Sequence, residues 1–273
     1  MRTVSLETIR PRSRNIYRFQ PISLSPLRYD CFYDSISIIM MERDEIRVAV
    51  DLVVFGLVED ELSVLMGRRP HAPYEGFWAL PGEFRRPGRS VDELAREVLE
   101  RTTGVERAWV EQLATFDRPA VEEVGGVATP GRDPRGEVLS VAYMAVVGAD
   151  RVRADYGGEL GWQAVRRLPG RVAFDHREIL DYAVRRLQSK LGYSSLGFEL
   201  LAEEFTLPEL QHVYEAVLGV ALNRGNFRRK VLEAGVIEDT GKTRPARGKP
   251  AHLYRFRRQA FGLLEAPDGF IEG

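Results

Sequence analysis

The side chains best suited to chemistry in this chain are arginines and aromatic rings gathered in and around residues 82–105. An arginine guanidinium presents its N–H donors in a planar fork and can bind a diphosphate through two parallel hydrogen bonds. An aromatic ring can stack on a base or a ribose. The pattern predicts a phosphorylated ligand, and a surface or core position is the alternative for each side chain. The candidate contacts are Arg68, Trp78, Phe84, Arg85, Arg89, Arg101, Phe116 and Arg135, with Arg96 as a further arginine of the group.

A helix is expected to carry part of this group at about residues 90–103. Ser90 followed by Glu93 has the form of a capping box, in which each side chain accepts a hydrogen bond from the backbone of the other residue. Apolar residues then recur at roughly helical spacing, and Gly104 suits a helix end because glycine adopts the left-handed conformation readily.

Residues 82–105 resemble the Nudix box, the metal-binding loop and helix of a family of pyrophosphatases. The box reads Gly, five residues, Glu, seven residues, Arg-Glu, an aliphatic residue, one residue, Glu-Glu, one residue, then Gly and an aliphatic residue. Placing the closing pair on Gly104 and Val105 fixes the other positions without a gap. These are Glu83 for the opening Gly, Arg89 for the first Glu, Glu97 and Val98 for Arg-Glu, and Arg101 and Thr102 for Glu-Glu. In this register every carboxylate of the box is missing.

A second register matches Arg96-Glu97 to the Arg-Glu pair and Glu100 to the next Glu, with a one-residue insertion before Gly104. Gly88 and Arg101 then stand where the first and last Glu belong. Mg²⁺ needs oxygen ligands, and an arginine would repel it. The first register therefore predicts an inactive domain without a metal or cofactor, whereas the second leaves hydrolysis open. An amphipathic helix unrelated to the box is a third interpretation.

Composition is that of an ordinary folded protein, with 273 residues, 44% hydrophobic and 29% charged, and a formal net charge of −1. The single cysteine, Cys31, excludes an intramolecular disulfide and a cysteine-based metal site. The apolar runs fall short of the roughly 20 residues that span a bilayer. The polar N-terminus lacks the apolar core of a signal peptide. We therefore expect a cytoplasmic protein without a membrane partner.

Residues 1–44 are expected to be an extension with little fold of its own, and residues 45–168 a ligand-sensing domain. A loop of about 20 residues separates the last two strands of this domain, a length typical of functional or disordered loops. The strands are expected at residues 46–58, 62–66, 109–116 and 138–147. Together with the Nudix resemblance, this order implies an α/β fold, a Nudix-like α/β/α sandwich with a mixed sheet.

A second domain is expected over residues 169–262, followed by a tail at residues 263–273. Thr206 and Glu209 form a second capping box, which opens a helix that ends at Gly219. A four-residue connection then leads to another short helix, and this spacing is typical of a helix-turn-helix. Two strands on either side of a Gly-, Lys- and Arg-rich loop complete a winged helix. The expected elements are helices beginning near residues 175, 207 and 223 and strands at residues 236–237 and 253–256.

Residues 223–258 form a concentrated basic patch, with eleven Lys and Arg against three Asp and Glu, a net charge of +8. Cations that neutralise DNA phosphates release counterions, and side chains on a helix in the major groove can read base edges. A solvated basic face on a packing helix is the alternative, but it does not explain the helix-turn-helix spacing. The residues expected to contact double-stranded operator DNA are Thr206, Asn223, Asn226, Arg228, Arg229, Lys230, Lys242, Arg244, Arg247 and Lys249.

The two halves together resemble the Nudix-related transcriptional regulators of NAD metabolism. The similarity covers about residues 45–258 and is closest in Phe174-Asp175-His176, in residues 205–219, in Asn226–Lys230 and in Leu253–Phe256. Residues 132–136 and 140–143 are also similar.

This resemblance implies a homodimeric repressor whose Nudix-like domain, without hydrolase chemistry, senses ADP-ribose or a related NAD metabolite. A sugar such as arabinose is an alternative effector for the same architecture. An active Nudix ADP-ribose pyrophosphatase, or a scaffold that binds RNA or a protein, are alternative functions.

Overall fold

The structure is a computed structural model that describes residues 46–117, 121–124, 127–130, 133–152, 159–192, 194–246 and 249–257. Glu45–Gly273 forms one compact unit. The predicted extension at residues 1–44 and the predicted tail at residues 263–273 lie outside the described residues.

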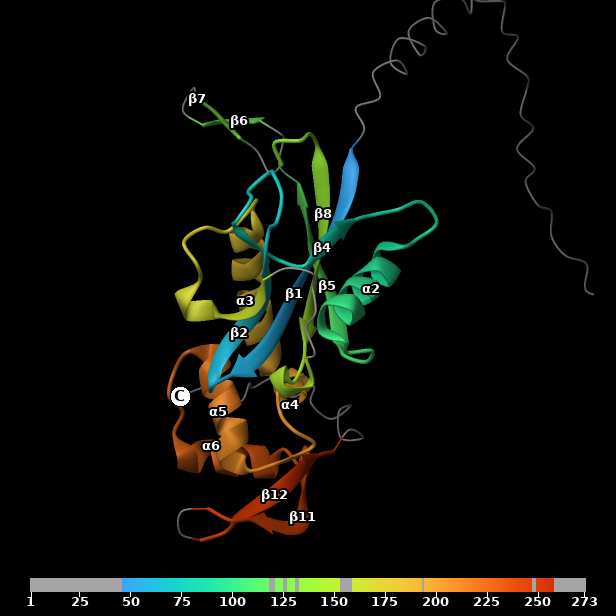
Figure 1. Ribbon diagram of the computed structural model, residues 1–273. Coiled ribbons are helices and arrows are strands. Elements are labelled where there is room, and N and C mark those ends of the chain that lie inside the picture. Colours follow the sequence, from blue (N-terminus) through green and yellow to red (C-terminus); the bar gives the residue numbers. More distant parts are fainter. Residues whose placement is uncertain are drawn as a thin grey trace, which may run out of the picture. The chain divides into compact units, whose positions relative to one another are not determined.

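A mixed seven-stranded sheet forms the centre of the first half of this unit (Figure 1). Its spatial order is β3-β2-β1-β8-β5, with β4 paired to β1 and β9 paired to β2. β1 runs parallel to β8 and antiparallel to β2, to which it is joined by a tight turn. The strands are β1 (Arg47–Val58), β2 (Glu61–Arg68), β3 (Trp78–Ala79), β4 (Gly82–Phe84), β5 (Trp109–Asp117), β8 (Val138–Val146) and β9 (Leu160–Ala164).

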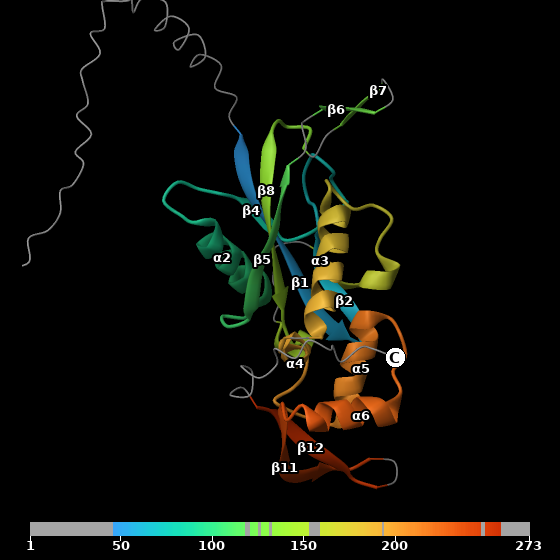
Figure 2. The ribbon, with the colours of Figure 1, turned by 180° about the vertical axis from the view of Figure 1, so that it is seen from behind.

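Two helices cover the two faces of the sheet, α2 (Val91–Thr103) on one side and α3 (His176–Leu191) on the other (Figures 1 and 2). Side chains that alternate along β1 enter two separate apolar clusters, because successive residues of a strand point to opposite faces. Val50, Leu52 and Val54 pack in the cluster that contains the α2 residues, and Val53 and Phe55 pack in the other. The predicted α/β/α sandwich is confirmed.

The second half of the unit is a winged helix, as predicted. A three-stranded sheet of order β10-β12-β11 lies beside two helices in helix-turn-helix arrangement. The elements are α4 (Leu196–Glu199), β10 (Glu204–Phe205), α5 (Leu207–Leu218), α6 (Arg224–Glu233), β11 (Ile237–Arg244) and β12 (Ala251–Phe256).

The helix ends follow the expected local chemistry. Both predicted capping boxes form, Ser90 with Glu93 at α2 and Thr206 with Glu209 at α5. The Asn223 side chain accepts a hydrogen bond from Asn226 N at 3.0 Å and so caps α6. These contacts satisfy N–H groups that have no partner within the helix.

Helix α3 belongs to both halves of the compact unit. It packs against β1 and β5 of the large sheet and also against α4 and α5 of the winged helix. One continuous apolar cluster therefore runs from the sheet through α3 into α5 and α6. The expected domain boundary at residue 169 stays a prediction.

Several elements were not anticipated from the sequence. The long loop before β8 contains a two-stranded hairpin, β6 (Val121–Val124) with β7 (Val127–Pro130). β9, β10 and α4 were also missed, because each is short and lacks a periodic apolar pattern. Within the described ranges, no helix is long and apolar enough to cross a membrane.

We expect Gly82→Ala to destabilise the fold by about 1–3 kcal/mol, the usual cost of forcing extra atoms into a packed site. A Cβ atom at this position would lie 2.6 Å from the carbonyl oxygen of Val50 and 2.6 Å from Asp51 Oδ1. Urea unfolding of both proteins measures the difference. Gly170→Ala is the control, since nothing lies within 4 Å of a Cβ at Gly170. Equal unfolding midpoints for the Gly82 variant and the control would contradict this account.

Candidate functional site

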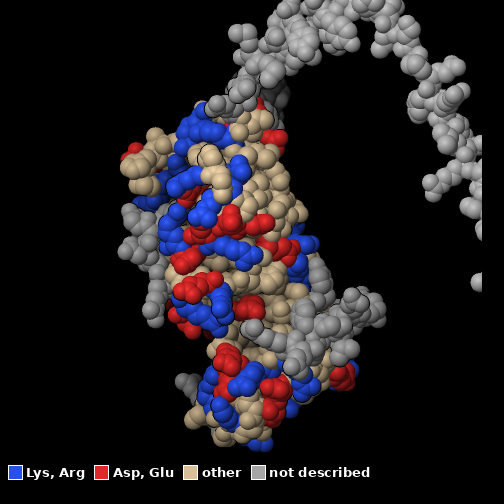
Figure 3. Space-filling model, turned by 90° about the vertical axis from the view of Figure 1, so that its right-hand side faces the viewer, with Lys and Arg blue, Asp and Glu red and all other residues tan. Residues whose placement is uncertain are grey.

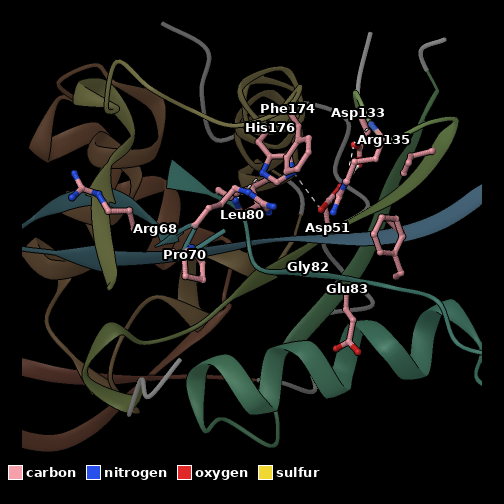
Figure 4. Close-up of a pocket in the computed structure, with 16 residues that line it drawn as sticks. Asp51, Arg68, Pro70, Leu80, Gly82, Glu83, Asp133, Arg135, Phe174 and His176 are labelled. Carbon is pink, nitrogen blue, oxygen red and sulfur yellow. Dashed lines mark hydrogen bonds and ion pairs between the residues drawn. The ribbon is translucent and has the colours of Figure 1, made fainter. Parts of the chain in front are cut away.

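A cavity of about 200 Å³ opens beside β1 and β4, on the side of the sheet where α3 begins (Figure 4). Sixteen residues line it, from β1, β2, β3, β4, the start of β8, the start of α3 and the loops beside these elements. Those with polar or aromatic side chains are Asp51, Arg68, Arg69, Glu83, Phe84, Asp133, Arg135, Phe174 and His176. The wall thus combines three arginines, three aromatic rings and three carboxylates with small and apolar residues.

A buried hydrogen-bond network ties α3 to the sheet at the base of the cavity. Leu80 N donates to His176 Nδ1 at 2.8 Å, and Ser140 Oγ donates to Asp51 Oδ2 at 2.5 Å. His176 Nε2 lies 3.4 Å from Asp51 Oδ1. Because Nδ1 accepts a hydrogen bond, the proton of a neutral imidazole must be on Nε2, facing Asp51. His176 and Asp51 are both almost fully buried, so the start of α3 is held in a fixed position.

Asp133 fixes Arg135 over the cavity. The Arg135 guanidinium donates from Nε and Nη2 to the Asp133 carboxylate at 2.9 and 2.7 Å, and Arg135 N also donates to Asp133 Oδ1. Burial alone would raise the pKa of Asp133, but the hydrogen bonds from Arg135 outweigh burial and lower that pKa. The guanidinium carbon lies 5.4 Å from the centre of the Phe84 ring and 5.8 Å from that of Phe174.

Phe174 is held between charged and aromatic neighbours. Its φ is 55°, in the left-handed region, which is strained for a bulky residue. Arg69 lies over its ring at 4.7 Å, and Tyr74 packs edge-on at 4.9 Å. Strain of this kind persists only where neighbours impose it, and it is concentrated at ligand sites.

The structure brings together three of the predicted ligand contacts, Arg68, Phe84 and Arg135, all of which line the cavity. The other five do not line it. Trp78 lies under the Arg68 guanidinium, and Phe116 packs edge-on against Tyr182. Arg85 donates to the carbonyl of Arg89, Arg89 pairs with Glu97, and Arg101 pairs with Glu83.

Six polar or aromatic cavity residues were not proposed from the sequence as ligand contacts: Asp51, Arg69, Glu83, Asp133, Phe174 and His176. Phe174 and His176 lie in the Phe174-Asp175-His176 motif, which the sequence offered only as a family similarity. Their position at the junction of a loop and α3 depends on long-range packing. This motif and the similar segment 132–136, which contains Asp133, were the available signals.

The glycines near the two ends of the Nudix-like segment, Gly82 and Gly104, have a structural role, and their positions favour the second register. Gly82 must be glycine because β4 approaches β1 closely, and Gly104 ends α2 with φ at 69°. One more residue separates them than the box allows, so Glu97 and Glu100 take two of the carboxylate positions. Arg101 occupies the last of these positions and binds Glu83 at 2.6 Å. Among the described residues, no three His, Cys, Asp or Glu side chains group closely enough to hold a metal ion.

The predicted DNA-binding residues fall into two groups. The side chains of Thr206 and Asn223 cap helices: Thr206 is buried and accepts a hydrogen bond from Glu209 N, and Asn223 accepts one from Asn226 N. Asn226, Arg228 and Arg229 are exposed on α6, and Lys230 is half-buried there. Lys242, Arg244 and Lys249 are exposed on the wing, whereas Arg247 lies outside the described residues.

Comparison with known proteins identifies relatives for each half and for the whole. Residues 197–256 match the family described as the NrtR DNA-binding winged helix domain. The chain is 33% identical over 231 residues to an ADPR responsive transcriptional repressor of Acinetobacter baylyi, which covers 81% of this chain and 88% of the relative.

Two further comparisons cover the structure and the first half. The crystal structure of Shewanella oneidensis NrtR complexed with a 27mer DNA matches with a TM-score of 0.67 and 32% identity, over 79% of this chain and 95% of that chain. An ADP-ribose pyrophosphatase of Methanocaldococcus jannaschii is 34% identical over 139 residues, which are 50% of this chain and 72% of that enzyme.

The Asp133–Arg135 pair predicts a pH-dependent stability. A carboxyl group whose pKa is lowered on folding stabilises the native state above its unfolded pKa of about 4, and this contribution is lost as pH falls through the folded pKa. Asp133→Asn should therefore be less stable than the unchanged chain at pH 7, by about 1–2 kcal/mol. The difference in unfolding free energy between the two proteins should shrink below about pH 4, because Asp133 of the unchanged chain then becomes protonated.

Urea unfolding between pH 3 and 7 measures this gap, with Asp181→Asn, an exposed position of α3, as the control. A gap for Asp133→Asn that stays constant across this range would contradict the assignment.

Proposed function

Because the chain belongs to the NrtR family of transcriptional repressors, we propose that it is an ADP-ribose-responsive repressor that binds operator DNA. The observation that carries the proposal is that one compact unit contains both a candidate ligand cavity and a candidate DNA-binding domain. An arginine- and aromatic-lined cavity lies in the Nudix-like half, and a winged helix follows. The family relationship favours ADP-ribose over a sugar as the effector.

The cavity matches the chemistry of ADP-ribose in outline. The diphosphate carries negative charge, and Arg68, Arg69 and Arg135 supply guanidinium groups at the wall. The adenine and the two riboses present flat or apolar faces that Phe84 and Phe174 can contact. Arg135 is already held by Asp133, so it loses little conformational freedom when a ligand binds.

We further propose that the Nudix-like domain binds its ligand without hydrolysing it. The support is the charge of the box: Glu97 pairs with Arg89 at 3.2 Å, and Glu83 pairs with both Arg86 and Arg101. Arg101 places a cation where the box requires a carboxylate. Incubation with ADP-ribose and Mg²⁺ or Mn²⁺ should give no product, whereas product formation that is lost in Glu97→Gln or Glu100→Gln would establish a pyrophosphatase instead.

On the DNA side, the exposed early turns of α6 suit a major groove and the wing suits the flanking backbone. Side chains at Asn226 and Arg228 can reach base edges, and Lys249 can neutralise a phosphate. We propose that two copies act together as a homodimer, because helix-turn-helix proteins commonly bind DNA as dimers whose recognition helices enter half-sites about one turn of DNA apart.

The direct test is fluorescence anisotropy with a duplex from upstream of the gene, measured with and without ADP-ribose. We expect binding at moderate salt and an affinity that ADP-ribose changes. Linkage requires DNA to change the affinity for ADP-ribose by the same factor, which calorimetry can check. The absence of binding to any neighbouring promoter, or an affinity that ADP-ribose leaves unchanged, would refute the proposal.

Arg135→Ala should weaken ADP-ribose binding by roughly tenfold or more, since a hydrogen bond to a charged group contributes about 1.5–3 kcal/mol. Calorimetric titration measures the affinity. Arg89→Ala is a matched control, because Arg89 is exposed and does not line the cavity. An equal loss in both variants would show that the cavity is not the effector site.

Arg228→Ala and Lys249→Ala should have different effects on DNA binding. If Arg228 reads a base, its loss should cost about 1–3 kcal/mol at the operator and relax specificity there. Loss of a phosphate contact at Lys249 should weaken binding to all sequences and reduce the salt slope by about 1. Titrations of operator and random duplexes at several salt concentrations distinguish a base contact from a phosphate contact. The same loss of affinity and the same salt slope in both variants would contradict these roles.

A further inference from the structure

Two carboxylates beside the start of α5 hold three cations of the wing. Glu204 Oε1 accepts hydrogen bonds from Lys242 Nζ at 2.8 Å and from Arg255 Nη2 at 3.2 Å. Arg244 Nη1 donates to Glu209 Oε1 at 2.5 Å, and its Nη2 donates to the carbonyl oxygen of Glu204 at 3.2 Å. A single residue, Glu204, therefore contacts Lys242, Arg244 and Arg255.

These carboxylates are fixed in place by the fold. The second oxygen of Glu209 accepts a hydrogen bond from Thr206 N at 2.7 Å, as part of the capping box of α5. The Glu204 side chain is 23% exposed, whereas that of its partner Lys242 is 64% exposed. The hydrogen bond from Lys242 lowers the pKa of Glu204, so its carboxyl group is charged at neutral pH.

The charge distribution along the chain shows the same arrangement. Residues 199–222 hold five Glu and neither Lys nor Arg, and they directly precede the segment of net charge +8. Folding places part of this acidic segment against the wing, and Figure 3 shows acidic and basic side chains intermixed at the winged-helix end. By contrast, Arg228 and Lys249 form no ion pair within the described part of the chain.

We infer that Glu204 and Glu209 form a carboxylate clamp that withholds Lys242 and Arg244 from DNA phosphates and so limits binding to non-operator DNA. A phosphate can use either cation only after it displaces a carboxylate that already contacts it. Each withheld cation removes one counterion-release contribution, which is the main source of sequence-independent affinity. Because this contribution is independent of sequence, the clamp leaves operator binding to depend more on the base contacts of α6. The inference rests on the proposed DNA-binding function.

The first test is Glu204→Gln, in the full chain, titrated against a random-sequence duplex between 50 and 200 mM salt. Release of Lys242 should steepen the slope of log affinity against log salt by about 0.9, which is about a 3.5-fold change in relative affinity over this range. Non-operator affinity should rise, whereas a merely structural role for Glu204 would lower it. Glu199→Gln on α4 removes the same charge from a residue without an ion pair in the described structure, and should leave the slope unchanged.

A double-mutant cycle identifies the released cation. Lys242→Gln alone should leave the non-operator slope unchanged, because the clamp already withholds Lys242. In the Glu204→Gln background the same change should reverse the added slope. Lys249→Gln, at a cation outside the clamp, should make the slope shallower in both backgrounds.

Three results would overturn the inference: an unchanged or shallower slope in Glu204→Gln, a slope in Glu199→Gln that steepens equally, or a loss of slope in Lys242→Gln equal to that in Lys249→Gln. Each of these outcomes leaves the proposed function intact, because the unchanged chain still binds its operator. Failure of the unchanged chain to bind any duplex would instead refute the proposed function and the clamp together.

Discussion

The simultaneous burial of α3 against two partners is the constraint on which the rest of the structure depends. His176 at its start contacts Asp51 of β1, and Gln188 near its end donates to the carbonyl of Val217 in α5 at 3.0 Å. Glu111 of β5 pairs with Arg186 and Lys190, which lie on either side of Gln188 in α3. At 1.5 Å per residue the helix is roughly 24 Å long. The cavity and the winged helix are thus attached to opposite ends of one rigid element.

This attachment gives the cavity a physical route to the DNA-binding half. Leu187 and Leu191 of α3 are fully buried in the cluster that also contains Leu210 and Val217 of α5. Close-packed interiors do not deform continuously, so a displacement at His176 has to be accommodated by α3 as a whole or by repacking against α5. The cavity is suited to cause such a displacement, because the strained Phe174 lies two residues before the helix starts and its ring contacts His176.

The sequence was sufficient for features that depend on neighbours along the chain. Capping boxes, helix-ending glycines and strand alternation are local, which is why α2, α5 and β1 were predicted closely. The cavity is not local. Asp51, Asp133 and His176 come from three distant segments, and whether Arg85 or Arg69 faces the cavity depends on how a loop passes a strand. The long apolar face of α3 was visible, but its division between a sheet and α5 follows only from tertiary packing.

The charge of the winged helix illustrates the same limit. A net charge counted along residues 223–258 describes a segment, whereas DNA responds to charges that are close in space and free to contact phosphate. Lys242 and Arg244 are already engaged by Glu204 and Glu209, which lie outside that segment. Within the described residues, Arg228 on α6 and Lys249 on the wing form no ion pair, so they are the cations available to DNA without displacing a carboxylate. Under the proposed clamp, the affinity for non-operator DNA depends on where the acids of residues 199–222 are folded, in addition to where the arginines lie.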